Sequence, residues 1–173
     1  MILPTTSIIS STIERVQQQV VSVALAYTSH EQWPLPPIRS IGRTPLRVSV
    51  LDSSFNPPTL AHLALANSQN PFSVTSGYDA TLLLLSVRNA DKILQEGDAT
   101  LSQRVEMMYL LATKVQSNDL ALPPNVAVGL VNEPAFTAKS SALRRFLDGH
   151  LRKLTSDPLY TPSFQVTFLM GSS

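Results

Sequence analysis

The chain has 173 residues, of which 43% are hydrophobic and 14% charged, a composition typical of a globular domain with a hydrophobic core. Its 13 Lys and Arg residues nearly balance its 12 Asp and Glu residues, and they form no basic run, which argues against nucleic-acid binding. The sequence has no cysteine, so disulfides, thiolate catalysis and zinc-thiolate sites are excluded. We find no apolar stretch of membrane-spanning length and no signal-peptide pattern. We therefore expect no membrane partner and an intracellular location, cytoplasmic or nuclear, with a mitochondrial one left open.

The first 45 residues are expected to form an N-terminal helix and a proline-rich linker. Apolar residues recur at helical spacing over residues 11–27, and a Ser/Thr pair at the start can cap this helix. Four prolines and a glycine follow between Trp33 and Pro45, so that stretch is neither helix nor central strand. We therefore divide the chain into residues 1–45 and a domain over residues 46–173.

The domain begins with a predicted strand, a short loop and a helix. Residues 46–51, LRVSVL, are predicted to form a buried strand. Proline can begin a helix but cannot continue one, so the helix is predicted to start at Pro57 or Pro58. Thr59 and His62 would then share one face at the positive end of the helix. We infer that this junction holds a phosphate.

Strands and helices alternate along the rest of the domain. Residues 80–87 form a continuous apolar run, which a parallel strand buried on both faces requires. Thr100 and Gln103 form a predicted capping box for a helix over residues 101–116. The remaining predicted elements are a strand over residues 126–131, a helix capped by Ser140 or Ser141, and a strand over residues 164–170.

This alternation predicts an α/β fold, a Rossmann-like parallel sheet with helices on both faces. Ligands of such sheets bind at the carboxyl ends of the strands, and polar loops follow several of the predicted strands here. No helix follows the strand at residues 164–170. We therefore expect the domain to be incomplete at its C-terminus.

The junction motif resembles the signature of a known superfamily. SFNPPTLAHL at residues 54–63 is similar to the nucleotide-binding signature of nucleotidylyltransferases, in the form found in nicotinamide mononucleotide adenylyltransferases. ADK at residues 90–92 and QRVEMMYLLA at residues 103–112 resemble the lysine loop and a helix of that family, particularly its fungal-type branch. FLMG at residues 168–171 resembles the start of its Gly-x-Asp segment.

The resemblance implies an enzyme that joins nicotinamide mononucleotide to the AMP moiety of ATP, giving NAD and pyrophosphate, with Mg²⁺ accompanying ATP. Positioning and charge stabilisation can support such a transfer without a covalent intermediate. The implied catalytic residues are His62, donating to an α-phosphate oxygen, Thr59, adding a hydroxyl, and Lys92, supplying a mobile cation. The implied nucleotide-binding residues are Ser53, Ser54, Phe55, Asn56, Thr59, His62 and Gly171.

Two parts of the family pattern have no counterpart in this sequence. Gly171 is followed by two serines where the family has Gly-x-Asp, and the later Ser-Ser-Thr-x-x-Arg motif, which binds ATP phosphates, has no place to occur. Ser-Ser-Thr-Ile-Glu-Arg does occur at residues 10–15, where we interpret it as a chance helix cap. Two alternatives stay open: a catalytically impaired nucleotide-binding module, and a nucleotidyltransferase for another phosphorylated acceptor. A homo-oligomer is also left open.

Other polar and aromatic residues are expected to have structural roles. Asp52 is expected to brace the motif loop, and Arg104 to serve the helix surface near Glu106 in preference to a phosphate. Trp33 is expected to be a hydrophobic anchor, and His150, on an apolar helix stripe, to be packed.

Overall fold

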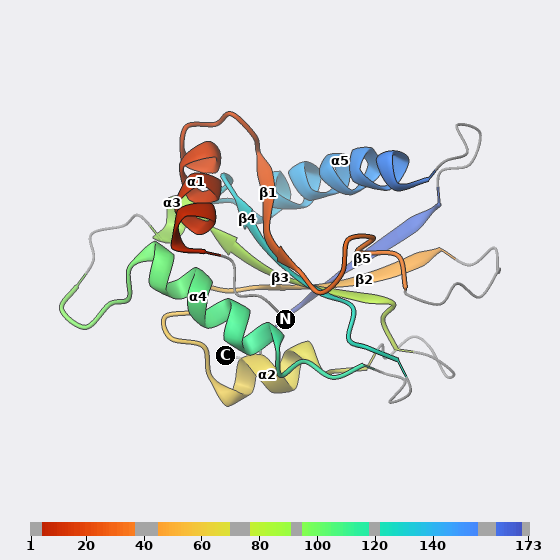
Figure 1. Cartoon of the computed structure of the whole chain (residues 1–173), viewed down its shortest axis with the longest axis horizontal. Coiled ribbons are helices and arrows are strands. Elements are labelled where there is room, and N and C mark those ends of the chain that lie inside the picture. Colours follow the sequence, from red (N-terminus) through yellow and green to blue (C-terminus); the bar gives the residue numbers. More distant parts are fainter. Residues whose placement is uncertain are drawn as a thin grey trace.

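One five-stranded sheet organises the part of the chain that the computed structural model describes, residues 5–36, 45–69, 77–90, 95–117, 122–155 and 162–170 (Figure 1). The strands are β1 (Val23–Thr28), β2 (Leu46–Asp52), β3 (Ala80–Ser86), β4 (Val126–Val131) and β5 (Phe164–Leu169). Their order across the sheet is β1-β4-β3-β2-β5. The pairs β2/β3, β2/β5 and β3/β4 are parallel, and β1 is antiparallel to β4. The predicted α/β, Rossmann-like fold is confirmed.

Helices cover both faces of the sheet, which explains the continuous apolar runs at its centre. The helices are α1 (Thr6–Gln17), α2 (Leu60–Ala66), α3 (Val87–Ala90), α4 (Leu101–Ala112) and α5 (Phe136–Leu154). Leu83 and Leu85 of β3 belong to the core beneath α1, α2 and α4, whereas Leu82 and Leu84 belong to the core beneath α5. All residues of β3 and β4 are therefore buried. Among the described residues, we find no helix with the length and apolar character needed to cross a bilayer.

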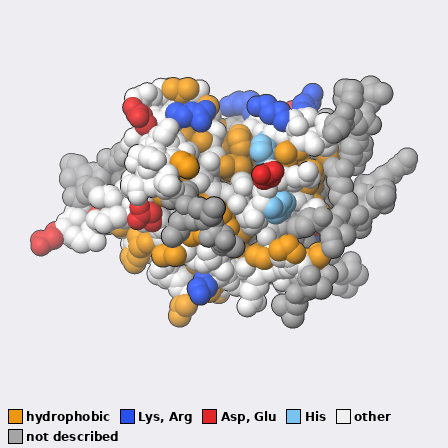
Figure 2. All heavy atoms as spheres, in the orientation of Figure 1, with side chains coloured by type: hydrophobic (Ala, Val, Ile, Leu, Met, Phe, Trp, Pro, Cys, Tyr) orange, Lys and Arg blue, Asp and Glu red, His pale blue; other side chains and the backbone are white. Residues whose placement is uncertain are grey.

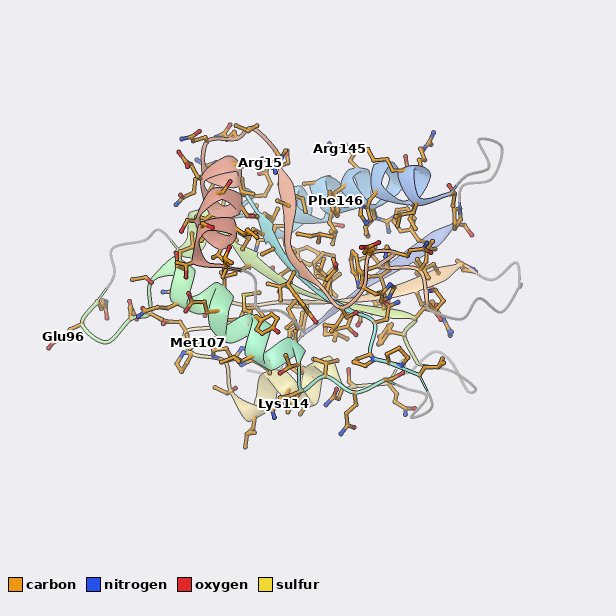
Figure 3. All side chains as sticks on the ribbon, viewed as in Figure 1. Arg15, Glu96, Met107, Lys114, Arg145 and Phe146 are labelled. Atoms are coloured by element: carbon orange, nitrogen blue, oxygen red, sulfur yellow. The ribbon has the colours of Figure 1, made fainter. Side chains whose placement is uncertain are left out.

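The outer face of α5 is basic and its inner face is apolar. Basic side chains gather along the outer side of this helix (Figure 2). Arg145 points outward, whereas Phe146 points toward the sheet and packs against the core beneath α5 (Figure 3). This polarity fixes which side of α5 covers the sheet.

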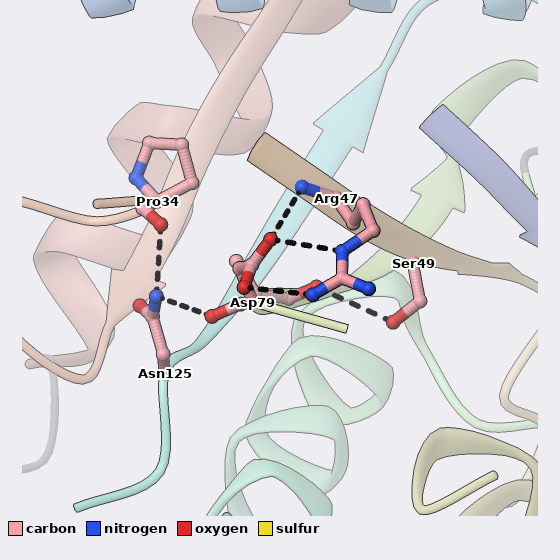
Figure 4. A network of polar contacts seen from close by, with 6 residues as sticks. Pro34, Arg47, Ser49, Asp79 and Asn125 are labelled. Carbon is pink, nitrogen blue, oxygen red and sulfur yellow. Dashed lines mark hydrogen bonds and ion pairs between the residues drawn. The ribbon is translucent and has the colours of Figure 1, made fainter. Parts of the chain in front are cut away.

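A polar network joins the amino ends of the central strands (Figure 4). The backbone N–H of Arg47 donates to Asp79 Oδ2 over 2.7 Å, and Arg47 Nε lies 3.4 Å from the same oxygen. Asn125 Nδ2 donates to the backbone oxygens of Pro34 and Asp79, each over 2.8 Å. These bonds stabilise the fold at the amino ends of the parallel strands, away from the carboxyl ends of β2 and β5.

The helix predicted over residues 11–27 is wrong in its second half. Helix α1 ends at Gln17, Gln19 adopts a left-handed φ of 59°, and residues 23–28 form β1. Residues 23–26 are mostly apolar and contact β4 along one edge of the sheet. A short apolar run fits a buried strand as well as a helix, so spacing alone could not separate the two. The domain division at residue 45 stays a prediction, and both sides of it contribute strands to the sheet.

Three helices begin elsewhere than predicted. Helix α1 begins at Thr6, before the predicted start at residue 11. Helix α2 begins at Leu60, beyond both prolines, because Thr59 is extended and acts as its N-cap. Helix α5 begins at Phe136, before the predicted caps Ser140 and Ser141. The strands predicted from residues 46, 80, 126 and 164 are confirmed to within one residue at each end, and α4 ends at Ala112, four residues early.

Candidate functional site

A cavity of about 300 Å³ opens at the carboxyl ends of β2 and β5. Strands β3 and β4 extend the sheet to one side of β2, whereas β5, which comes later in the chain, pairs with its other side. Parallel α/β sheets bind ligands where the strand order reverses in this way. The cavity is lined by Leu51, Asp52, Ser53, His62, Leu65, Phe136, Phe168, Leu169 and Met170.

His62 is held at this cavity through both ring nitrogens. Its Nδ1 lies 2.9 Å from the backbone N of Thr59 and 2.8 Å from Thr59 Oγ1, and its Nε2 lies 2.8 Å from Ser53 Oγ. A backbone N–H can act as a donor alone, so Nδ1 must accept, and a neutral ring then carries its proton on Nε2. His62 therefore presents an N–H donor on the cavity side.

Burial lowers the pKa of His62 below its ordinary value. The neutral form with the proton on Nε2 is favoured by this shift and by the Thr59 amide. That tautomer donates to the Ser53 hydroxyl and cannot take its proton. The pair is therefore not arranged as the nucleophile and base of a hydrolase.

Phe55 supports the His62 ring from the core. Its side chain is fully buried, and its ring centroid lies 5.1 Å from that of His62. Its φ of 45° is a left-handed conformation that non-glycine residues seldom adopt, and such strain is often found at functional sites. Because the side chain is buried, the predicted contact of Phe55 with nucleotide would have to come from its backbone.

Asn56 ties the motif loop to the segment before α4. Its Nδ2 donates to Asp98 Oδ1 over 2.7 Å, and its Oδ1 accepts from the Ala99 backbone N–H over 2.9 Å. The pKa of Asp98 is lowered first by the backbone N–H of Gln95, then by the Asn56 side chain, and further by the charge of Arg104. Both polar groups of Asn56 are thus engaged within the protein.

Arg104 braces the same loop from a buried position. Its Nε donates to the backbone oxygen of Ala99 over 2.9 Å, and its Nη1 lies 3.5 Å from that of Ser54. The residue is 5% exposed. Arg104 thus has the expected structural role, but toward the motif loop and not at the helix surface near Glu106.

Lys139 was not among the residues predicted from the sequence. Its Nζ donates to Asp52 Oδ2 over 2.6 Å, and the residue is 6% exposed. Asp52 was expected to brace the motif loop, but it binds Lys139 of α5, whose position lies 87 residues away in the chain. Lys139 shares the buried stripe of α5 with Leu143 and Leu147, so a lysine at helical spacing from buried leucines was the available signal.

The predicted site residues fall into three groups. Lys92 and Gly171 lie outside the described residues. Ser54 is exposed on the motif loop, whereas Phe55 and Asn56 also make the structural contacts given above. Their roles toward a nucleotide stay predictions. The residues that hydrogen bonds bring together at the cavity are Ser53, Thr59 and His62.

The Ser-Ser-Thr-Ile-Glu-Arg segment does not cap a helix, so that interpretation is wrong. Residues 10–15 lie inside α1, whose N-cap is Thr5. Thr12 Oγ1 donates back to the Ile8 backbone oxygen over 2.8 Å, as helix-interior threonines do. A segment without free helix-terminal N–H groups offers no phosphate grip.

Trp33 and His150 have the packing roles expected of them. Trp33 is fully buried in the core beneath α5. His150 Nε2 lies 2.8 Å from the Trp33 backbone oxygen, and its ring stacks on Phe146 with centroids 5.4 Å apart. Neither residue lines the cavity.

Comparison with known proteins gives one informative match. Over 70 residues the chain is 41% identical to a protein of Schizosaccharomyces pombe (strain 972 / ATCC 24843) described as "Putative nicotinamide mononucleotide adenylyltransferase". This match supports a nucleotidyltransferase-like family. It covers 40% of this chain and 25% of that protein, so the chain spans about a quarter of the length of its relative. No family model and no solved structure matches the chain, and the fungal-type branch stays a prediction.

Proposed function

We propose that this chain provides the nucleotide site of an adenylyltransferase that joins nicotinamide mononucleotide to the AMP moiety of ATP. A phosphate oxygen of the mononucleotide attacks the α-phosphorus of ATP, the bond from that phosphorus to the bridging oxygen breaks, and NAD and pyrophosphate result. The observation that carries the proposal is the His62 N–H donor at a cavity where the strand order reverses. The name of the Schizosaccharomyces pombe relative supports the choice of acceptor.

His62 acts in this proposal as a neutral hydrogen-bond donor. An α-phosphate oxygen takes the place of Ser53 Oγ as the acceptor for Nε2–H, so no change of protonation is needed. The Thr59 amide keeps the tautomer fixed, and the Phe55 ring limits movement of the imidazole. A donor held in place before charge develops is what stabilises a phosphoryl-transfer transition state.

The other proposed residues extend this phosphate site. Thr59 orients His62 and offers its hydroxyl, and Lys92 supplies the cation for the phosphates. Nucleotide contacts are further assigned to the polar groups of Ser53 and Ser54, to the backbone at Phe55 and Asn56, and to Gly171.

Mg²⁺ is proposed to arrive with the ATP phosphates. Asp52 is the carboxylate in the described cavity lining, and it is paired with Lys139. The described residues contain no cluster of three or more His, Asp or Glu that could hold a metal. Magnesium commonly keeps several waters and binds through substrate phosphates, so this lining suits a substrate-borne ion.

The test measures NAD formation by the purified chain with ATP, Mg²⁺ and nicotinamide mononucleotide. We expect His62→Ala to lower the rate by on the order of 10²-fold, the usual effect of removing one transition-state donor. His30→Ala is the matched control, because His30 bonds Asn125 at the amino ends of the parallel strands, away from the cavity. This variant should retain the wild-type rate.

Other outcomes separate the alternatives. Equal rates in wild type and His62→Ala would overturn the role of His62. ATP binding without NAD would favour a binding module, unless pyrophosphate is released with a different phosphorylated acceptor, which would favour a related transferase.

A further inference from the structure

Lys139 and Asp52 form an ion pair beside the cavity. The Nζ and Oδ2 atoms are 2.6 Å apart, and the two side chains are 8% and 19% exposed. Asp52 ends β2 and lines the cavity next to Ser53, whereas Lys139 comes from the first turns of α5 and is not a lining residue. Asp52 therefore forms part of the cavity wall, and the Lys139 ammonium pairs with its carboxylate from outside the lining.

The position of Lys139 is unfavourable for a lysine in two respects. A buried ammonium is costly unless a charge partner compensates for its lost hydration. A cation near a helix N-terminus also opposes the helix dipole, whereas Arg152 and Lys153 of α5 stand at the favourable end. Neither helix stability nor burial explains why a lysine stands at position 139, whereas its ion pair with Asp52 does.

Asp52 would otherwise work against an anionic ligand. It is the acidic residue of the described lining, which contains no lysine or arginine. An unpaired carboxylate in a partly buried wall repels a phosphate, because charges interact strongly where little water screens them. Pairing with Lys139 removes that negative charge while keeping the carboxylate in place.

The ion pair also fixes one wall of the cavity. It ties the start of α5 to the end of β2, and α5 begins with Phe136, a lining residue. The Phe136 ring meets the Phe168 ring edge to face, with centroids 4.8 Å apart. The charge pair and the aromatic pair thus join α5 to the ends of β2 and β5.

We propose that Lys139 is a positioning residue that neutralises Asp52 and thereby allows the cavity to accept nucleotide phosphates. This inference rests on the proposed nucleotide site. Lys139 acts through Asp52, without touching the ligand. Its effect should therefore depend on the charge of the ligand, which a purely structural anchor would not do.

The test compares the affinities of the full chain for ATP and for uncharged adenosine by calorimetry. Lys139→Met should weaken ATP binding about tenfold or more, because it leaves Asp52 unpaired, and should leave adenosine binding within about twofold. The double variant Asp52→Asn/Lys139→Met should recover most of the ATP affinity. Arg152→Met is the matched control, because it removes one positive charge from the exposed end of α5.

The outcomes distinguish this inference from the proposed function. Equal losses for ATP and adenosine, or no recovery in the double variant, would overturn the role of Lys139 while wild-type ATP binding upholds the nucleotide site. Wild-type protein that binds neither ligand would overturn the site and the inference together. If Lys139→Met does not fold, the double variant is compared with wild type and with Asp52→Asn. A clear loss of ATP affinity in the double variant would overturn the inference, because Lys139 would then act other than through Asp52.

Discussion

The backbone N–H of Thr59 donates to Nδ1 of His62 over 2.9 Å, and this contact decides which nitrogen of the ring carries the proton. The N-terminal turn of α2 therefore sets the tautomer before any ligand binds. It leaves Nε2–H as a donor at the end of β2, where Ser53 Oγ accepts it. A short helix and its N-cap thus prepare the chemistry of the cavity.

The stability of the protein should depend on the protonation of His62. Burial lowers its pKa in the folded state, so the unfolded state binds the proton more readily. The contribution of neutral His62 to stability is therefore fully present above the unfolded pKa of about 6.5, and it is lost as the pH falls toward the lower folded pKa. Urea unfolding at several pH values should show a smaller acid-side loss in His62→Gln than in wild type. Identical pH profiles would contradict this.

Breaking the Lys139–Asp52 pair should destabilise the fold. Lys139→Met leaves a partly buried carboxylate without its partner, and removing one partner of a buried pair costs about 3 kcal/mol or more. Arg152→Met breaks an exposed pair with Asp148, 3.0 Å apart, and should cost less than about 1 kcal/mol. Denaturant unfolding of both variants measures the difference, and similar losses would refute the assigned weight of the buried pair.

Asn56 should matter for stability as well as for the proposed site. Asn56→Ala removes the bonds to Asp98 and Ala99, so we expect a loss of about 1 to 3 kcal/mol. Asn67→Ala is a comparison at the C-cap of α2, where the side chain accepts a more exposed bond from the Gln116 amide. Unfolding free energies should rank Asn56→Ala as clearly the more damaging, and the reverse order would count against a bracing role.

Two glycines should respond oppositely to alanine. A Cβ at Gly129 of β4 would lie 3.1 Å from Leu82 Cδ1, so Gly129→Ala should cost about 1 to 3 kcal/mol through overpacking. A Cβ at Gly149 of α5 would meet nothing within 4 Å, so Gly149→Ala should add about 0.5 to 1 kcal/mol through helix propensity. Thermal or urea unfolding tests both, and a stabilised Gly129→Ala would show that β4 has spare room.

The central strands were predictable because helices on both faces demand continuous apolar runs, as at residues 80–86. Strand β1 was not predictable, because the spacing of apolar residues in it fits a helix as well as a strand. In addition, no Gly or Pro marks the turn at Gln19. The start of α2 was misplaced because the prolines that can open a helix stand before Thr59 in an extended loop. These are local ambiguities that tertiary packing resolves.

The candidate site was partly predictable for a different reason. The motif at residues 54–63 places Thr59 and His62 three apart, so their contact is local and the sequence contains it. The Lys139–Asp52 pair joins the start of α5 to the end of β2, which lie far apart in the chain. No local sequence pattern could therefore predict this contact. The proposed role of Lys92 stays a prediction.

The tautomer of His62 and its response to ATP show most directly whether His62 donates a hydrogen bond to the nucleotide phosphate. Nitrogen NMR of the ¹⁵N-labelled chain, assigned with His62→Gln, should show the Nε2–H tautomer at neutral pH. Addition of ATP with Mg²⁺ should shift the Nε2 resonance as the α-phosphate replaces Ser53 Oγ, and adenosine should not. An Nδ1–H tautomer, or bound ATP that leaves Nε2 unchanged, would contradict the claim that His62 donates to the nucleotide phosphate.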